Sequence, residues 1–274
     1  MNLYISDLDG TLLDTNAKLL SESKKILNDL ITNNNINFTI ATARTPATIV
    51  NILDGLKLNL PVITMNGSAI YSLNKKEYIY YNPIKKHLIK KIYTIIKNEN
   101  INAFTYSIKN NHLFVFYDKL LNKYQIEFYN ERKNSSLKSF INKSISLEND
   151  ILYFTILDYK DKVLSLYDKI KNLEGISITM YSDIYNPGIY ILEIYDINSS
   201  KAKAITLLKN KYNFDKLITF GDNANDIPMF KISDECYSVE NGINELKNIS
   251  TKVIGLNSDN SVAKFILEKE KTSN

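Results

Sequence analysis

The stretch Leu3-Tyr4-Ile5-Ser6-Asp7-Leu8-Asp9-Gly10-Thr11, close to the start of the chain, decides the fold. Its first four residues are typical of a short buried strand, and two aspartates and a glycine follow at once. Because side chains alternate along an extended chain, we expect Asp7 and Asp9 to project on one side, with Leu8 opposite. Two carboxylates at the carboxyl end of a strand repel each other unless a cation lies nearby. This edge of an open α/β sheet also binds ligands, and Gly10 permits a tight turn there; a simple Asp- and Gly-rich turn is the structural alternative.

Apolar runs of strand length alternate with helical patterns after this stretch. Residues 37–42 and 61–65 are the next strand candidates. An amphipathic pattern over 20–33, with Ser21 as its expected N-cap, predicts the first helix. Thr45-Pro46 predicts the start of a second helix, because proline is favoured at the first helical position. This β-α-β-α-β order predicts a parallel sheet with right-handed crossovers.

The pattern changes after Pro83, where strands are no longer separated by single helices. Helices are expected at 85–98 and 160–173, and strands at 101–107, 112–117, 152–157 and 176–181. The alternation then returns, with helices expected at 200–212, 225–230, 243–249 and 262–269 and strands at 217–220, 236–239 and 252–254. We therefore predict an α/β fold: a doubly wound parallel-sheet (Rossmann-like) core, residues 1–83 and 188–274, interrupted by an inserted α+β domain, residues 84–187. Asn82-Pro83 and Asn186-Pro187 mark the two crossings.

A second acidic cluster, Gly221-Asp222-Asn223-Ala224-Asn225-Asp226, follows the strand predicted at 217–220. Asp222 and Asp226 are four residues apart, so one helical turn would place them on a shared face. Carboxylate oxygens suit a hard cation such as Mg²⁺, which keeps waters and substrate phosphate oxygens among its ligands. The structural alternative is that Asp222 or Asn225 caps a helix, a role that can coexist with chemistry.

Two further signals are weaker. Thr42 ends a predicted strand in Thr42-Ala43-Arg44, where its hydroxyl and the nearby amides could hold a phosphate. Lys201 begins a predicted helix, where a cation opposes the helix dipole and therefore suggests a carboxylate or phosphate partner. A solvated surface lysine is the alternative for Lys201 taken alone.

The composition of the chain argues against several classes of protein and of site. The 274 residues are 44% hydrophobic and 23% charged, which is ordinary for a globular protein. The single cysteine, Cys236, excludes an intrachain disulfide framework and is expected in the core. With only two histidines, catalysis must depend mainly on carboxylates, Lys, Arg, Thr or Asn. The net charge of +4 comes from dispersed lysines, so nucleic acid is not an expected partner. Since no run approaches the length of a membrane span or a signal peptide, we expect a cytoplasmic protein without membrane attachment.

Together these motifs resemble those of the haloacid dehalogenase-like superfamily, and within it the Cof-type phosphatases. The resemblance covers nearly the whole core, and four motifs occur in the family's order. They are Asp7-Leu8-Asp9-Gly10-Thr11-Leu12-Leu13, Ala41-Thr42-Ala43-Arg44, Ser200-Lys201-Ala202 and Gly221-Asp222-Asn223-Ala224-Asn225-Asp226-Ile227-Pro228-Met229. Asn66-Gly67 and Asn241 also fall where members of the family carry Asn-Gly and Asn-Ala.

The resemblance implies an Mg²⁺-dependent phosphomonoester hydrolase. Asp7 would be the nucleophile that forms an aspartyl phosphate, and Asp9 the general acid and base. Mg²⁺ would be held by Asp7, the backbone carbonyl of Asp9 and Asp222. The inserted domain corresponds to the family's large cap, which closes over the core and selects the substrate.

The remaining motif residues would bind phosphate or support the metal site. Thr42, Ala43 and Lys201 would donate hydrogen bonds to the phosphate. Asn225 and Asp226 would orient Lys201 and the metal's waters rather than bind the metal directly. Arg44 has two open roles, either contact with a second anionic group of the substrate or a structural ion pair.

Departures from the family pattern concern selectivity more than activity. Ala43 replaces the usual glycine, Glu240-Asn241-Gly242 replaces Gly-Asn-Ala, and Asn260-Ser261-Val262-Ala263 replaces Asp-Gly-Val-Ala. The expected partner is a small phosphorylated metabolite (a sugar phosphate, a nucleotide or a phosphorylated cofactor), and the expected assembly is a monomer or homodimer. Two alternatives stay open: a phosphosugar mutase, and a sensor that binds a phosphorylated ligand without turnover.

Overall fold

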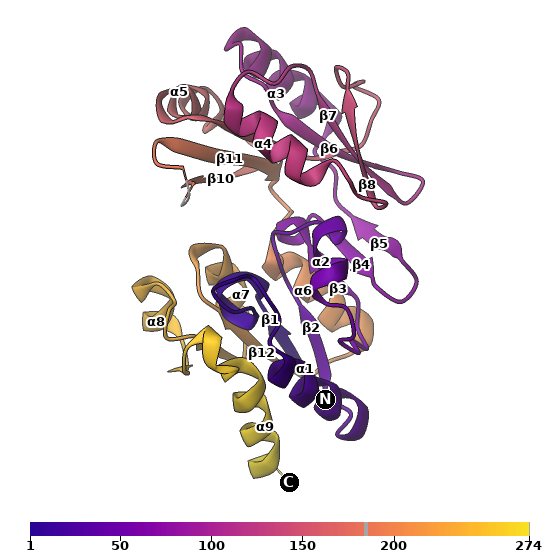
Figure 1. The fold of residues 1–274 in the computed structure, drawn as a ribbon, viewed down its shortest axis with the longest axis vertical. Helices are drawn as coiled ribbons and strands as arrows, with labels where there is room; N and C mark the ends of the chain where they lie inside the picture. Colours follow the sequence, from indigo (N-terminus) through magenta and orange to yellow (C-terminus); the bar gives the residue numbers. More distant parts are fainter. Residues whose placement is uncertain (184–185, 274) are drawn as a thin grey trace. The chain divides into compact units, whose positions relative to one another are not determined.

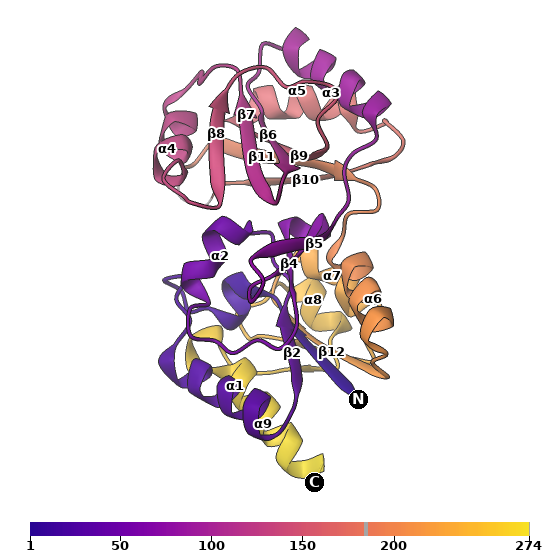
Figure 2. The same ribbon diagram turned by 90° about the vertical axis from the view of Figure 1, so that its right-hand side faces the viewer.

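The computed structural model describes residues 1–183 and 186–273, and the chain divides into two compact units. The core unit comprises Met1–Tyr80 and Ser200–Asn274, and the inserted unit comprises Tyr81–Ser199. Figures 1 and 2 show both units as ribbons.

The core unit is built on a five-stranded parallel sheet with the order β14-β13-β12-β1-β2. The strands are β1 (Asn2–Ser6), β2 (Asn37–Ile40), β12 (Lys216–Gly221), β13 (Glu235–Ser238) and β14 (Lys252–Val253). β1 lies between β2 and β12 and is fully buried from Leu3 to Ser6. Both acidic motifs therefore leave neighbouring strands at the same edge of the sheet.

Helices cover both faces of this sheet, as the doubly wound prediction requires. Tyr4 belongs to a core with α1 (Ser21–Asn33), α2 (Pro46–Ile52) and α9 (Ser261–Ser273). Leu3 and Ile5, which alternate with Tyr4, belong to the opposite core with α6 (Lys201–Tyr212), α7 (Ile227–Phe230) and α8 (Asn244–Ile249). Figure 2 shows α1 beside α9 below the sheet. The expected α/β architecture is confirmed.

Two local expectations in this unit are wrong. Ser21 is the first helical residue of α1 rather than its N-cap; Leu20 has the extended backbone of the cap position and supplies no side-chain hydrogen bond. The third predicted strand, β3 (Val62–Thr64), is present but is not one of the five strands of the parallel sheet, which it meets at a parallel bridge between Ala41 and Ile63. It pairs instead in a separate three-stranded sheet with β4 (Ala69–Ser72) and β5 (Glu77–Tyr81), which the sequence analysis did not predict.

The inserted unit contains a six-stranded sheet with the order β10-β11-β9-β6-β7-β8. Its strands are β6 (Phe104–Lys109), β7 (His112–Tyr117), β8 (Lys138–Asn142), β9 (Ile151–Tyr159), β10 (Ile176–Ser182) and β11 (Ile189–Asp196). α3 (Lys86–Asn98) and α5 (Lys160–Ile170) pack on one face. α4 (Lys123–Arg132) packs on the other, where Phe128 stacks on Phe104 at 4.7 Å between ring centroids. The unit is α+β, as expected.

The end of the inserted unit lies further along the chain than Asn186-Pro187. β11 was not predicted, yet it pairs with β9 on one side and β10 on the other. Because a strand with two partners belongs to their sheet, the unit extends to Ser199. On the α4 face, three tyrosines from neighbouring strands stack in a row: Tyr106 on Tyr153 at 4.0 Å, and Tyr153 on Tyr195 at 5.0 Å.

Candidate active site

Asp7 lies at the carboxyl end of β1, where its backbone N–H still bonds to the carbonyl of Phe220 on β12 at 2.9 Å. Its side chain is buried, with an exposed fraction of 5%. β1 ends at Ser6, and Leu8–Leu12 then forms a short π-helical turn in which Gly10 has φ of +74°. A Cβ at Gly10 would lie 2.4 Å from Oδ2 of Asp222, so this position requires glycine for both reasons.

Lys201 connects the two acidic motifs. Its Nζ donates to Oδ1 of Asp7 at 2.5 Å and to Oδ1 of Asp226 at 2.7 Å, and all three side chains are buried. Ser200 caps α6 by accepting the N–H of Lys203, which fixes Lys201 as the first helical residue. The position of Lys201 at the start of a helix predicts a carboxylate or phosphate partner. The structure contains two carboxylate partners, Asp7 and Asp226.

Asp226 is fully occupied by structural contacts. Its Oδ1 accepts from Lys201, and its Oδ2 accepts the backbone N–H groups of Asp222 at 3.0 Å and Asn223 at 3.1 Å. The structural alternative, an N-cap at Asp222 or Asn225, is not what the structure contains, because Asn223 occupies the cap position and forms a capping box with Asp226. Asp226 therefore supports Lys201 and the Asp222 loop, and has no oxygen left without a hydrogen bond.

Asp222 contacts the loop that follows Asp7. Thr11 donates its hydroxyl to Oδ1 of Asp222 at 2.9 Å, a contact that the sequence analysis missed. Oxygens of Asp7, Asp222 and Asp226 lie within 4.8 Å of one another. Thr11 could have been noticed from its position two residues after Asp9, on the same turn as Gly10.

Burial and charge repulsion perturb the pKa values of this cluster. Burial raises the pKa of Asp7 well above its ordinary value, which Lys201 opposes and which Asp226 and Asp222 reinforce. Burial, and then repulsion from Asp226, raise the pKa of Asp222 to about 6. Burial disfavours the Lys201 ammonium, but the attraction of Asp226 and Asp7 outweighs it and raises its pKa. The lysine is therefore a permanent cation at neutral pH.

The donor set suits a divalent cation. Three ionised carboxylates and one ammonium leave two negative charges in a buried space. The raised pKa values of Asp7 and Asp222 express this unfavourable excess, which a second positive group would relieve. Hard carboxylate oxygens are the ligands that Mg²⁺ prefers. Asp226 accepts hydrogen bonds at both oxygens, whereas Asp7 and Asp222 each accept a side-chain hydrogen bond at Oδ1.

Asp9 does not share this centre with Asp7. Its carboxylate instead accepts two hydrogen bonds from Arg44, Nε to Oδ2 at 2.7 Å and Nη2 to Oδ1 at 2.6 Å. The carboxylates whose oxygens lie within 4.8 Å of one another are those of Asp7, Asp222 and Asp226, while the backbone of Asp9 remains extended, with φ of −78° and ψ of 127°. The expectation that Asp7 and Asp9 project on one side stays a prediction. Of the two roles left open for Arg44, the ion pair is the one that the structure contains.

Thr42 and Ala43 form the turn after β2. Thr42 is buried, its N–H bonds to the carbonyl of Ile63, and its hydroxyl accepts the N–H of Arg44 at 3.1 Å. Ala43 has no positive φ, so a Cβ at this position imposes no backbone strain. Its N–H makes no hydrogen bond to any residue in 1–183 or 186–273. The hydroxyl proton of Thr42 and the amide of Ala43 are thus able to bind a phosphate oxygen.

A strained turn supports this loop from the other side. Met65, Asn66 and Gly67 all have positive φ, and the N–H groups of Met65 and Asn66 bond to the carbonyls of Arg44 and Thr42 at 3.0 Å each. A Cβ at Gly67 would lie 2.2 Å from the carbonyl oxygen of Ser200. Asn225, expected near the substrate, donates to Oδ1 of Asn66 at 3.4 Å.

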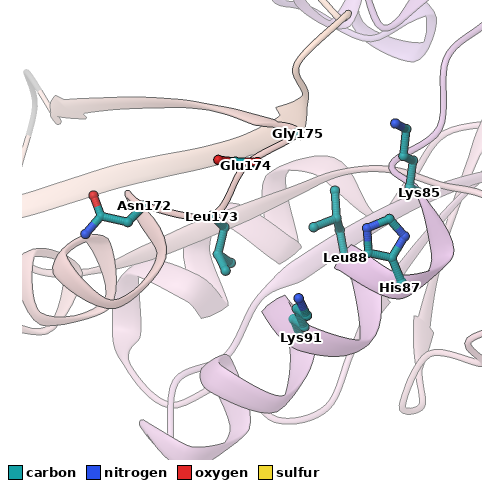
Figure 3. Close-up of a pocket in the computed structure, with 8 residues that line it drawn as sticks. All are labelled: Lys85, His87, Leu88, Lys91, Asn172, Leu173, Glu174 and Gly175. Atoms are coloured by element: carbon teal, nitrogen blue, oxygen red, sulfur yellow. The ribbon is translucent and has the colours of Figure 1, made fainter.

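A cavity of about 560 Å³ lies elsewhere, in the inserted unit, between the start of α3 and the loop after α5 (Figure 3). None of the predicted site residues lines it. Its basic side chains are exposed. The lining residues are Lys85, His87, Leu88, Lys91, Asn172, Leu173, Glu174 and Gly175. The buried acidic cluster at the end of β1 is therefore the candidate active site.

The chain is similar to known proteins over nearly its whole length. A model of the haloacid dehalogenase-like hydrolases matches residues 4–266. A "Putative phosphatase" of Buchnera aphidicola subsp. Baizongia pistaciae is 31% identical over 278 aligned positions, which cover 96% of each chain. The 5-amino-6-(5-phospho-D-ribitylamino)uracil phosphatase YwtE of Bacillus subtilis is 27% identical, with 97% of each chain covered. A crystal structure from Thermotoga maritima shares the fold, with a TM-score of 0.77 at 23% identity, covering 97% of this chain and 96% of that one. Among the described residues, no helix is long and apolar enough to cross a membrane.

Proposed function

Since the chain belongs to the haloacid dehalogenase-like hydrolase family and is a phosphatase, we propose that it hydrolyses small phosphate monoesters through Asp7, with Mg²⁺ as its cofactor. The observation that carries the proposal is the buried cluster in which Lys201 contacts Asp7 and Asp226, with Asp222 alongside. A carboxylate held in this way is an oriented nucleophile beside a permanent cation.

Asp7 and Asp222 would hold Mg²⁺ with their side chains, and the backbone carbonyl of Asp9 would complete the protein ligands, as the family motif implies. When bound, the ion would neutralise charge between the nucleophile and the phosphate, so that two anions can approach each other.

In the first half-reaction an oxygen of Asp7 attacks the phosphorus, and the bond from phosphorus to the leaving oxygen breaks. Asp9 gives its proton to that oxygen, so the alcohol leaves neutral. For this transfer one oxygen of Asp9 must be released by Arg44, which in the structure occupies both. In the second half-reaction Asp9 accepts a proton from water, the water oxygen bonds to phosphorus, and Asp7 is released with inorganic phosphate.

Three groups of the chain would stabilise the transferring phosphoryl group. Lys201 has a third proton beyond those donated to Asp7 and Asp226. Thr42 and the amide of Ala43 supply the other donors. Because they are already fixed by the fold, they need no reorganisation during the reaction, which is the condition under which such donors contribute most.

The substrate is proposed only as a class: a small phosphorylated metabolite. The name of the Bacillus subtilis relative makes the phosphorylated ribitylaminouracil the first compound to try, at 27% identity. Sugar phosphates, nucleotides and phosphorylated cofactors belong in the same panel. A mutase would return the phosphoryl group to its substrate, and a sensor would bind the ligand without turnover and have no use for Asp9.

The test is release of inorganic phosphate from this panel, with Mg²⁺ or with chelator, for the wild type and Asp7→Asn. Asp54→Asn, the same chemical change at an exposed position, is the matched control. We expect metal-dependent release that is lost in Asp7→Asn and kept in Asp54→Asn. Wild-type release from Asp7→Asn would contradict the nucleophile assignment. Formation of an isomeric phosphate ester without free phosphate would favour the mutase, and binding without turnover would favour the sensor.

A further inference from the structure

The turn at residues 240–243, between β13 and α8, contacts both loops that carry the acidic motifs. The Asn241 side chain donates through Nδ2 to the carbonyl oxygen of Gly10 at 2.7 Å. Two residues later, the N–H of Ile243 donates to the carbonyl oxygen of Asp222 at 2.8 Å. One short turn is thus hydrogen-bonded to the backbone beside Asp9 and to the backbone of Asp222.

Asn241 is itself held in one orientation. Its Oδ1 accepts the N–H of Asn257 at 3.1 Å, while Nδ2 of Asn257 donates to the carbonyl oxygen of Leu13 at 2.7 Å. Since Gly10 offers only an acceptor and Asn257 only a donor, the amide of Asn241 can satisfy both in a single orientation. The two asparagines therefore hydrogen-bond to the loop that follows Asp7 at two of its carbonyl oxygens, those of Gly10 and Leu13.

Close packing in this turn depends on Gly242. A Cβ at that position would lie 2.5 Å from Oγ of Ser238 and 3.2 Å from the carbonyl oxygen of Asp222. The turn can approach the Asp222 loop this closely because residue 242 has no side chain.

The two loops also meet directly, because Thr11 donates to Oδ1 of Asp222 at 2.9 Å. We propose that Asn241 is a positioning residue, which fixes the spacing between the Asp7–Asp9 loop and the Asp222 loop and so sets the affinity of the site for Mg²⁺. This inference rests on the proposed function, in which Asp7 and Asp222 hold the ion.

Because Asn241 is exposed, a positioning role can be distinguished from a role in stabilising the fold. Asn241 is exposed, so water can satisfy the Gly10 carbonyl when the amide is removed, and little stability is lost. The affinity of a metal site depends more strongly on such contacts. Removing a residue that orients a metal ligand typically lowers the affinity for the metal by about 10- to 100-fold. A loss of Mg²⁺ affinity without a loss of stability is therefore the signature of positioning.

The experiment is calorimetric titration of the full chain with Mg²⁺, together with urea unfolding in chelator. The variants are Asn241→Ala, Asn241→Ser and Asp222→Asn. The matched control is Asn248→Ala, at an exposed asparagine of α8 whose side chain makes no hydrogen bond to the residues that the structure describes. We expect the Mg²⁺ dissociation constant to rise on the order of 10-fold in both Asn241 variants. It should not change in Asn248→Ala, and unfolding in chelator should match the wild type for the Asn241 variants.

Each other result overturns one of the two proposals. Wild-type Mg²⁺ affinity in both Asn241 variants, with weak binding in Asp222→Asn, overturns the role of Asn241 and leaves the proposed function standing. Weaker binding accompanied by an equal loss of stability in chelator makes Asn241 structural and also overturns it. A wild type that does not bind Mg²⁺, or an Asp222→Asn variant that binds it as well as the wild type, overturns the metal site of the proposed function.

Discussion

Arg44 holds both carboxylate oxygens of Asp9 through two parallel hydrogen bonds, at 2.7 and 2.6 Å. Such a fork fixes the plane of the carboxylate as well as its distance. The hydrogen bonds that Arg44 donates to Asp9 are also the largest cause of the raised pKa of Arg44. Of the two roles left open for Arg44, the structure contains the ion pair, and its partner Asp9 is the proposed general acid and base.

Replacing Arg44 with lysine should therefore impair proton transfer more than substrate binding. An ammonium keeps the charge but cannot hold both oxygens in one plane. We expect Arg44→Lys to lower kcat by about 10- to 100-fold with little change in KM, because small misplacement of a catalytic group is costly. Steady-state kinetics on the best phosphate ester checks this, with Arg132→Lys as the control at the other arginine. An increase in KM alone would instead indicate that Arg44 contacts the substrate.

Removing the charge of Lys201 should destabilise the protein as well as inactivate it. Lys201→Met leaves Asp7 and Asp226 buried without their shared cation. We expect the free energy of unfolding to fall by about 3–5 kcal/mol, as when one partner of a buried ion pair is removed. Urea unfolding in chelator measures the loss. The double variant Lys201→Met/Asp226→Asn should recover part of it, and no recovery would argue against repulsion as the cause.

The proposed Mg²⁺ site should weaken in acid. Because the pKa of Asp222 is raised to about 6, the folded metal-free protein carries a proton there below that pH. This proton competes with the metal, so we expect the Mg²⁺ dissociation constant to rise as pH falls through about 6. Thr11→Val removes a hydrogen bond that lowers this pKa, and should move the transition to higher pH. Mg²⁺ titrations between pH 5 and 8 would check both, and an affinity independent of pH would contradict the assignment.

Glu193 in the inserted unit should make stability depend on pH. Glu193 is buried beside the tyrosine row, with an exposed fraction of 9%, and among the described residues its carboxylate accepts a hydrogen bond only from the hydroxyl of Tyr195, at 2.8 Å. Burial raises its pKa from 4.5 to about 7, against the lowering effect of that hydrogen bond. A raised pKa contributes stability below about pH 4.5 that is lost as pH rises through 7.

Glu193→Gln should therefore be more stable than the wild type at pH 8, by an amount on the order of 3 kcal/mol, and similar to it near pH 4.5. Urea unfolding of both proteins at each pH measures the difference. Glu127→Gln, at an exposed glutamate of α4, is the control and should show no such dependence. Equal free energies of unfolding for Glu193→Gln and the wild type at pH 8 would contradict the raised pKa of Glu193.

The site could be predicted from sequence where strand ends impose the geometry. Asp7, Thr42 and Asp222 follow adjacent parallel strands, and Lys201 begins a helix, so their convergence follows from topology. The partner of Asp9 could not be predicted in this way, because Asp9 lies on a turn whose course depends on Gly10. Capping by Asn223 was also beyond pattern reasoning, since several Asn and Asp residues compete for that role within six positions.

The fold was predictable in its core and less so in its connections. β3 has the composition of a core strand, but pairing with β4 outweighs extension of the parallel sheet. α4 lacks a continuous apolar face, and only Gln125 among its residues is buried, so periodicity could not reveal it. β11 differs, because its β-branched and aromatic residues are typical of a strand; the Asn-Pro signal at 186–187 was wrongly taken as the end of the insertion.

The position of β1 between β2 and β12 has a consequence for synthesis on the ribosome. One edge of β1 stays without its partner until residues 216–221 have been translated. The inserted unit, whose strands pair only with one another, is translated completely before then. Domains usually fold in the order in which they emerge, but here β1 is made before the inserted unit and belongs to the unit that is completed after it. The nascent chain must therefore keep the apolar β1 segment from aggregating while more than two hundred further residues emerge.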